Sequence, residues 1–261
     1  MFLLRQALSA DEKLYKAEKI FLLVKDSYNF KIVPELNCLK VIAYLSSRQS
    51  FFCSKASDLI KTVFSSTLPV INTLKQPTTK AWVEQALNHL NVILLDHSHC
   101  ERKAAGVALN LMFRYPSYTQ LVRQLTAIAR EELEHFEQVN QWLERRDIPL
   151  APLSSPPYGA GLTAQIRRAE PERLLDSLLV SGLIEARSHE RLGLLATHCP
   201  DQELAKFYGS LMASEARHYG TYWVLADTYF ERDVVKERLE DLAIKESELL
   251  ATLHPEPRIH S

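Results

Sequence analysis

The chain has 261 residues, of which 46% are hydrophobic, 24% are charged and only 7 are glycine, and its formal net charge is −1. This length suits one large domain or a domain with an appendage, and the composition favours helices over sheets. Four cysteines without C-x-x-C spacing argue against a zinc ribbon and a disulfide framework. Residues 76–261 hold 20 Lys and Arg against 26 Asp and Glu, and this negative balance argues against a protein that coats nucleic acids without specificity. No apolar run approaches the roughly 18–20 residues that cross a bilayer, and the opening MFLLRQALSADEK is too briefly apolar for a secretory signal, so we expect a cytoplasmic protein that does not enter a membrane.

The first segment, residues 1–66, differs in character from the rest of the chain. Residues 1–75 carry 11 Lys and Arg against 6 Asp and Glu, and they hold short apolar runs such as IFLLV with weak helix caps. We expect an N-terminal extension that need not pack on the main domain. Two interpretations stay open: a poorly ordered appendage, or residues that lie upstream of the true start of translation.

The main domain, residues 67–261, is predicted to be a succession of long helices. The first helical stretch ends near Tyr115. The second covers residues 116–146, opens with Ser117 and Gln120 in the spacing of a capping box, and repeats its apolar residues at helical intervals.

A loop and three more helices complete the predicted domain. Residues 147–163 hold four prolines and two glycines, which predicts a loop. Helix resumes near Pro171, and two further helices follow over 201–230 and 231–253. Two short turns and one long connection between four helices predict an all-α fold, a ferritin-like four-helix bundle with one long crossover, plus a C-terminal helix and the N-terminal appendage.

The motif Glu-x-x-His occurs on two of these helices, as Glu132 with His135 and as Glu215 with His218. The i,i+3 spacing places both side chains of each pair on one helix face. A single pair of this kind is usually a solvated helix surface. Two pairs favour a metal site only if the other two helices each supply an inward glutamate, because a carboxylate-bridged pair of metal ions needs that set.

The other two helices do carry such glutamates, Glu101 in LLDHSHCERKAAGVAL and Glu185 in LLVSGLIEARSHERLGLL. Both lie in apolar surroundings with small neighbours, where an unpaired charge would be costly and a cation would offset that cost. Glu101 lies 31 residues before Glu132, and Glu185 lies 30 residues before Glu215, so each helix pair returns to a similar depth. We therefore predict one site for two metal ions at mid-bundle. Oxygen-rich ligands with one nitrogen per ion suit iron or manganese better than zinc.

Four segments read together resemble one family: LLDHSHCERKAA, REELEHFEQV, LIEARSHERLGLLA and SEARHYGTYW. The chain resembles the bacterial tRNA hydroxylases that act on 2-methylthio-isopentenyl-adenosine (MiaE-type), and the resemblance runs from about residue 67 to near the end of the chain. The resemblance implies six ligands to two iron ions. They are Glu101, Glu132, His135, Glu185, Glu215 and His218.

The resemblance also implies an activity and partners. Such an enzyme is a non-haem di-iron monooxygenase that hydroxylates the isopentenyl group of the adenosine just 3′ of the anticodon. It uses dioxygen and two electrons from an external donor such as a ferredoxin with its reductase. Glu132 and Glu215 are expected to bridge the irons, His135 and His218 to supply nitrogen, and Glu101 and Glu185 to be more terminal. A single-stranded anticodon loop would be the tRNA contact, and a monomer is expected.

Two alternatives remain open from the sequence. A di-iron oxygenase acting on a fatty aldehyde or another apolar small molecule uses the same ligand types and would show a long apolar tunnel. A structural helical bundle without metal would leave the six residues apart. Their position in space therefore separates the last alternative from the others.

Overall fold

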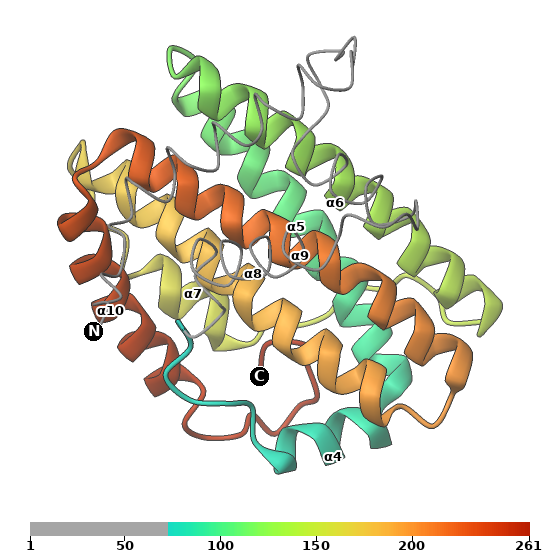
Figure 1. The fold of residues 1–261 in the computed structure, drawn as a ribbon. Helices are drawn as coiled ribbons and strands as arrows, with labels where there is room; N and C mark the ends of the chain where they lie inside the picture. Colours follow the sequence, from blue (N-terminus) through green and yellow to red (C-terminus); the bar gives the residue numbers. More distant parts are fainter. Residues whose placement is uncertain (1–72) are drawn as a thin grey trace, which may run out of the picture. The chain divides into compact units, whose positions relative to one another are not determined.

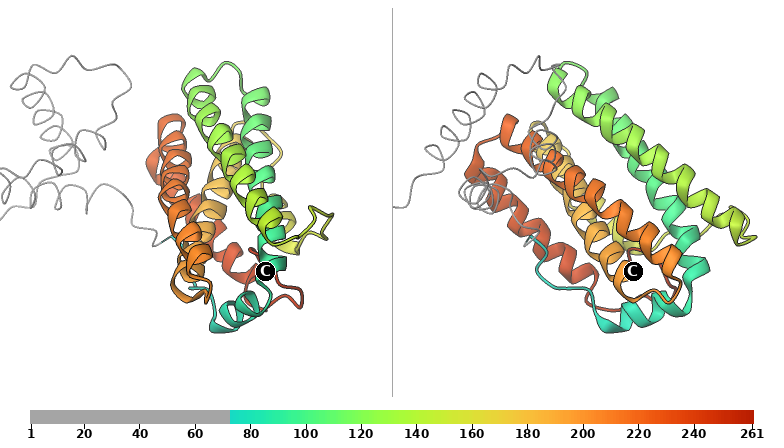
Figure 2. Two further views of the ribbon diagram at one scale, coloured as in Figure 1. Left: turned by 90° about the vertical axis from the view of Figure 1, so that its right-hand side faces the viewer. Right: turned by 45° about the vertical axis from the view of Figure 1, so that its right-hand side comes forward.

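The computed structural model describes residues 73–261, and within them every regular element is a helix. Four long helices form the bundle: α5 (Leu90–Arg114), α6 (Thr119–Arg145), α8 (Glu172–His198) and α9 (Gln202–Tyr229). α5 packs along α6, and α8 packs along α9, so the bundle consists of two helical hairpins (Figures 1 and 2). The segment that links α6 to α8 is the single long crossover. The predicted all-α, ferritin-like bundle is thus confirmed, whereas the predicted extension over residues 1–66 lies outside the described residues.

Three shorter helices surround the bundle. α4 (Lys80–Asn88) precedes α5, α7 (Pro157–Thr163) lies within the crossover, and α10 (Arg232–Leu249) follows α9 and packs against α7 and α8. Figure 1 shows α10 alongside the α8–α9 hairpin, with α4 across one end of the bundle. None of the helices of residues 73–261 combines the length and the apolar character needed to cross a membrane.

Three sequence predictions about local structure were wrong. The first helical stretch is interrupted at His89, whose φ of −134° and ψ of 39° are not helical, so α4 and α5 are separate helices. The predicted capping box is not formed, because α6 begins at Thr119 after Tyr118, which makes no side-chain cap. The proline-rich crossover is not loop throughout, since Pro157 occupies the first position of α7, where its missing N–H costs no hydrogen bond.

The apolar core consists of two clusters along the bundle axis, and the helices contribute to both. On each long helix, the apolar residues before the predicted ligand belong to one cluster and those after it belong to the other. On α5, for example, Leu94 lies in one cluster and Ala108 in the other, with Glu101 between them. On α9, Leu211 and Leu225 lie in different clusters on either side of Glu215 and His218. The predicted ligands therefore lie in a polar layer between two apolar layers. Apolar surroundings of this kind keep water away and strengthen electrostatic interactions.

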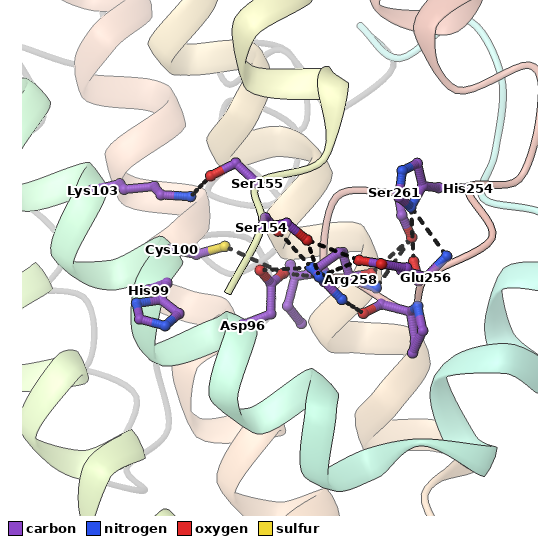
Figure 3. A network of polar contacts seen from close by, with 12 residues as sticks. Asp96, His99, Cys100, Lys103, Ser154, Ser155, His254, Glu256, Arg258 and Ser261 are labelled. Atoms are coloured by element: carbon purple, nitrogen blue, oxygen red, sulfur yellow. Dashed lines mark hydrogen bonds and ion pairs between the residues drawn. The ribbon is translucent and has the colours of Figure 1, made fainter. Parts of the chain in front are cut away.

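The last residues of the chain are packed into the body of the domain. Arg258 is only 3% exposed and lies among the crossover, the tail and α5 (Figure 3). Its guanidinium donates to the Ser154 carbonyl and hydroxyl, and its Nε lies 3.8 Å from Asp96 Oδ1. Asp96 also accepts the backbone N–H of Ile259 at 2.7 Å. This network, which we call the tail anchor (Asp96, Ser154, Arg258 and Ile259), holds α5 little more than one turn before Glu101.

Candidate metal centre

The six side chains predicted from the sequence meet in one buried cluster at the middle of the bundle. They form two groups in which the potential ligand atoms all lie within 4.8 Å of one another. The first group is Glu101, Glu132, His135 and Glu215, and the second is Glu132, Glu185, Glu215 and His218. Each of the four long helices contributes, and Glu132 and Glu215 belong to both groups. A helical bundle that leaves these residues apart is thereby excluded.

Four buried atoms of this cluster make no hydrogen bond of ordinary geometry among the described residues, although two of them lie at ion-pair distance from each other. These atoms are Glu132 Oε1, His135 Nδ1, Glu215 Oε1 and His218 Nδ1. Buried polar atoms are normally paired, because leaving one unpaired costs about 1–3 kcal/mol. His218 Nδ1 lies 2.7 Å from Glu132 Oε1, and His135 Nδ1 lies 3.6 Å from Glu101 Oε2. A metal ion bound in each group of ligands would satisfy all four atoms. The residues therefore fit the pair of metal ions that the sequence implied.

The electrostatics of the carboxylates point in the same direction. Burial, followed by the neighbouring charge of Glu185, raises the pKa of Glu132 to about 8. Burial and the three other carboxylates raise the pKa of Glu215 well above its ordinary value. Burial would also raise the pKa of Glu101, but His97 and His135 outweigh it and hold that pKa below its usual range. Four carboxylates in one dry volume repel one another, and two divalent cations would neutralise them.

The two histidines respond in the opposite sense. Burial alone would lower their pKa values, but the adjacent carboxylates raise the pKa of His135 to about 9 and that of His218 to about 11. Without metal, protons therefore take the place of cations in this cluster. A metal ion has to displace these protons in order to bind.

Further residues hold the ligands in place, and the sequence did not identify most of them. His97 Nε2 lies 2.5 Å from Glu101 Oε1, one helical turn earlier on α5. Glu131 accepts a hydrogen bond from His218 Nε2 at 2.9 Å, and Ser214 Oγ lies 3.2 Å from His135 Nε2. Sequence spacing indicates His97, which lies four residues before Glu101. Glu131 and Ser214 contact histidines on other helices, so no local spacing reveals them.

The oxygen-rich donor set is typical of an iron site. Each group offers three carboxylates and one imidazole. Hard oxygen ligands with a single nitrogen suit iron or manganese, whereas zinc prefers closed sets of nitrogen and sulphur. The described part of the chain therefore holds a buried cluster of side chains suited to a metal ion such as iron.

Comparison with known proteins gives three kinds of match. The chain matches the family described as "tRNA-(MS[2]IO[6]A)-hydroxylase (MiaE)" over residues 65–261. It is 42% identical over 185 residues to a tRNA 2-(methylsulfanyl)-N(6)-isopentenyladenosine(37) hydroxylase of Pseudomonas putida, an alignment that covers 71% of this chain and 90% of that protein. A protein of the same name from Salmonella typhimurium is 31% identical over 242 residues, which covers 74% of this chain and 89% of the other.

One solved structure is also similar. It is titled "Protein 43 with aldehyde deformylating oxygenase activity from Synechococcus" and is 53% identical to this chain, with a TM-score of 0.71. The similarity covers 73% of this chain and 96% of that one.

Proposed function

The chain belongs to the tRNA-(MS[2]IO[6]A)-hydroxylase family, as the four sequence segments predicted, and we propose that it hydroxylates the isopentenyl group of 2-methylthio-N6-isopentenyladenosine next to the anticodon of tRNA. It is an enzyme of the oxygenase class. The observation that carries the proposal is the convergence of four glutamates and two histidines from four helices, within a chain that matches this family from residue 65 to 261.

Six residues would hold two iron ions in this enzyme. Glu132 and Glu215 belong to both groups of ligands and would bridge the ions, while His135 and His218 would each bind one ion through Nδ1. Glu101 and Glu185 belong to one group each and would be the terminal carboxylates. The bound iron pair supplies the activation of dioxygen, one atom of which enters the substrate while the other leaves as water with two electrons and two protons from outside.

The remaining contribution of the chain is geometric and electrostatic. The two apolar clusters keep water from the polar layer between them, which protects an oxidising centre from side reactions. Burial raises the pKa of the Tyr222 hydroxyl well above its ordinary value, and the negative charges of Glu185 and Glu132 raise this pKa further. Tyr222 therefore stays protonated at neutral pH and offers the cluster a neutral neighbour. The cofactor carries out the oxidation, and the protein orients it and excludes competing reactions.

The partners follow from this chemistry. The two electrons would come from an external redox protein such as a ferredoxin with its reductase. An enzyme that acts on tRNA would work in the cytoplasm, where its substrate is. A flexible anticodon loop exposes its bases, so recognition can depend on stacking and local contacts, and an acidic domain as a whole does not prevent it.

A second candidate function is the oxidation of an aldehyde, because the 53% identical Synechococcus protein is titled with aldehyde deformylating oxygenase activity. A fatty aldehyde would need a long apolar channel that ends at the cluster. Two pockets among the described residues do not provide one, because none of the six clustered residues lines either of them. The larger, about 480 Å³, is a polar surface hollow around Tyr118 and Tyr229, and the other lies beside Arg187 and Trp82. The proposed tRNA substrate thus keeps the stronger support, from the family match and two named relatives.

The nucleoside composition of tRNA tests both candidates. We expect deletion of the gene to leave 2-methylthio-N6-isopentenyladenosine without its hydroxyl group in host tRNA, and complementation with the intact chain to restore the hydroxylated nucleoside. Complementation with the Glu132→Ala variant should fail. If the hydroxylated nucleoside persists in the deletion strain, the substrate is wrong. Conversion of a long-chain aldehyde by the purified iron-loaded protein, with tRNA unchanged, would favour the second candidate.

A further inference from the structure

The two metal-binding histidines are supported by corresponding residues of different chemistry. In each Glu-x-x-His motif, the residue just before the glutamate contacts the histidine of the other motif. Glu131 precedes Glu132 and accepts the Nε2–H of His218 at 2.9 Å. Ser214 precedes Glu215, and its Oγ lies 3.2 Å from His135 Nε2. The sequence repeat is therefore also a repeat of contacts, but one histidine meets a carboxylate and the other meets a hydroxyl group.

The hydrogen bonds around these contacts fix the proton positions. The Ser214 hydroxyl donates to the Leu211 carbonyl at 2.7 Å, so its oxygen accepts the Nε2–H of His135. Glu131 Oε2 has no proton to give and accepts from both His218 Nε2 and the Arg217 guanidinium, the latter at 3.0 Å. Both histidines consequently carry the proton on Nε2 and present Nδ1 to the cluster. The tautomer of each is set by its outer contact.

The two contacts have different electronic consequences. A carboxylate that accepts an imidazole N–H draws the proton toward itself and increases the electron density on the other ring nitrogen, which makes that nitrogen a stronger metal ligand. A hydroxyl group does so less. His218 is thus the stronger nitrogen donor of the two, although both occupy corresponding positions in the bundle.

The two terminal carboxylates also differ, but here the group of ligands that contains His135 has the additional contact. Glu101 is held through Oε1 by His97, four residues earlier on α5. The residue at the corresponding position before Glu185 is Ser181, whose hydroxyl donates to the Ser177 carbonyl at 2.9 Å instead. In one group of ligands, Glu101 is held by His97 and the histidine is the weaker donor, His135. In the other group, the histidine is the stronger donor, His218, and no side chain of α8 holds Glu185.

We propose that Glu131 is a positioning residue that makes the two metal positions unequal, so that the ion bound by His218 is held more tightly than the ion bound by His135. The proposal deepens the proposed function and rests on its two-ion site. Ser214 positions His135 in the same way, but its hydroxyl group strengthens that histidine as a metal ligand less than a carboxylate would. An unequal pair leaves one ion as the position at which ligands exchange more readily.

Titration with Co²⁺ alone, followed by calorimetry, tests this assignment without catalysis. We expect the intact chain to bind two ions in two separable steps. Glu131→Gln keeps the size of the side chain and an oxygen that can accept the His218 N–H, but removes the charge. It should weaken the tighter step by about 10-fold or more, within the 10–100-fold typical of such outer contacts. Ser214→Ala should weaken the other step and leave the tighter one unchanged.

Glu134→Gln is the matched control, because Glu134 lies on the same helix, carries the same charge and is exposed. It should titrate like the intact chain. Mössbauer spectra of the ⁵⁷Fe²⁺-loaded proteins provide a second readout, in which Glu131→Gln should shift one of two quadrupole doublets and Glu134→Gln neither. Thermal unfolding of the metal-free variants identifies any loss of folding.

The possible results separate this inference from the function on which it rests. Two bound ions with identical titrations for Glu131→Gln and Glu134→Gln would overturn the role of Glu131 and leave the two-ion site intact. The same holds if Glu131→Gln and Ser214→Ala weaken the same step. An intact chain that binds fewer than two ions would overturn both proposals.

Discussion

At the scale of single residues, the six clustered side chains do not contribute equally. Glu132 and Glu215 belong to both groups of ligands, whereas each histidine belongs to one. We expect His135→Ala and His218→Ala each to lower bound iron by about one ion per chain, and Glu132→Ala to lower it by more than one. Metal analysis after anaerobic loading measures this, with Glu134→Ala as the control on the same helix. Full iron content in Glu132→Ala would show that this residue is not a ligand.

The protonation of the same residues predicts how the stability of the metal-free protein depends on pH. The folded-state pKa values of Glu132, about 8, and His135, about 9, exceed the ordinary values of 4.5 and 6.5. The folded state therefore binds more protons than the unfolded state between about pH 4.5 and 9, and the free energy of unfolding should fall as the pH rises through that range. Thermal unfolding of the metal-free protein at pH 6 and pH 9 measures this fall.

Iron loading should change that dependence. Metal ions displace the protons, so loading at pH 7 should release protons into the buffer, and the loaded protein should lose less stability than the metal-free protein between pH 6 and pH 9. Calorimetric titrations in buffers of different ionisation enthalpy count the released protons. A metal-free protein that becomes more stable toward pH 9 would contradict the protonation described for the cluster.

Site residues that belong to a pattern within the sequence could be predicted, whereas residues that act through contacts with distant parts of the chain could not. Glu101 and Glu185 could be predicted because each is a charge in an apolar helical stretch and lies about 30 residues before the glutamate of a Glu-x-x-His motif, which is a pattern within the sequence. Glu131 and Ser214 could not, since each contacts a histidine about 80 residues or more away. A glutamate on an amphipathic helix is ordinarily a solvated residue, and only the packing of α6 against α9 gives Glu131 its partner.

At the scale of helices, α10 is held to the bundle by an ion pair that is completely buried. Arg187 on α8 donates to both oxygens of Glu246 on α10, each at 2.8 Å, and the two side chains are 1% and 0% exposed. Removing one partner leaves an uncompensated buried charge. We expect Arg187→Leu to lower the free energy of unfolding by about 3–5 kcal/mol, as typical for a broken buried pair.

The double variant Arg187→Leu with Glu246→Leu is the control for that prediction. It removes both charges, so chemical denaturation should find it more stable than Arg187→Leu alone. If the double variant is no more stable than the single one, the loss comes from packing or from the hydrogen bonds to Thr78 and Glu190, and the buried charge is not its cause.

The existence of the long helices was predictable, whereas their interruptions were not. Apolar residues at helical spacing and the short turns indicated all four bundle helices. The break at His89 has no proline or glycine to mark it, and the residues on both sides continue the helical pattern. α7 was missed for the opposite reason, because its prolines and glycines indicate a loop, while burial of Tyr158 and Leu162 stabilises one short helix there.

At the scale of the whole molecule, the tail anchor connects the last residues of the chain to the helix that carries Glu101. Arg258 and Asp96 are almost fully buried, and Figure 3 shows them where the crossover, the tail and α5 meet. Arg258→Met should lower the free energy of unfolding by about 3–5 kcal/mol, because the buried Asp96 carboxylate then loses its cationic partner and keeps only the Ile259 N–H and the weakly donating Cys100 thiol.

Asp96→Asn provides the comparison for the tail anchor. The amide still accepts the Ile259 N–H but carries no charge, so we expect a smaller loss than in Arg258→Met. Denaturant unfolding measures both variants. Equal stability of Arg258→Met and the intact chain would show that the tail does not stabilise the domain.

The central claim concerns the whole enzyme: an iron pair in this bundle transfers one oxygen atom from dioxygen to tRNA. The most direct measurement supplies the iron-loaded chain with a chemical reductant, isotopically labelled dioxygen and tRNA that carries 2-methylthio-N6-isopentenyladenosine. The account predicts that this nucleoside gains one labelled oxygen atom with the intact chain and none with Glu132→Ala. An unchanged nucleoside with the fully iron-loaded intact chain, or a product whose oxygen comes from water, would contradict it.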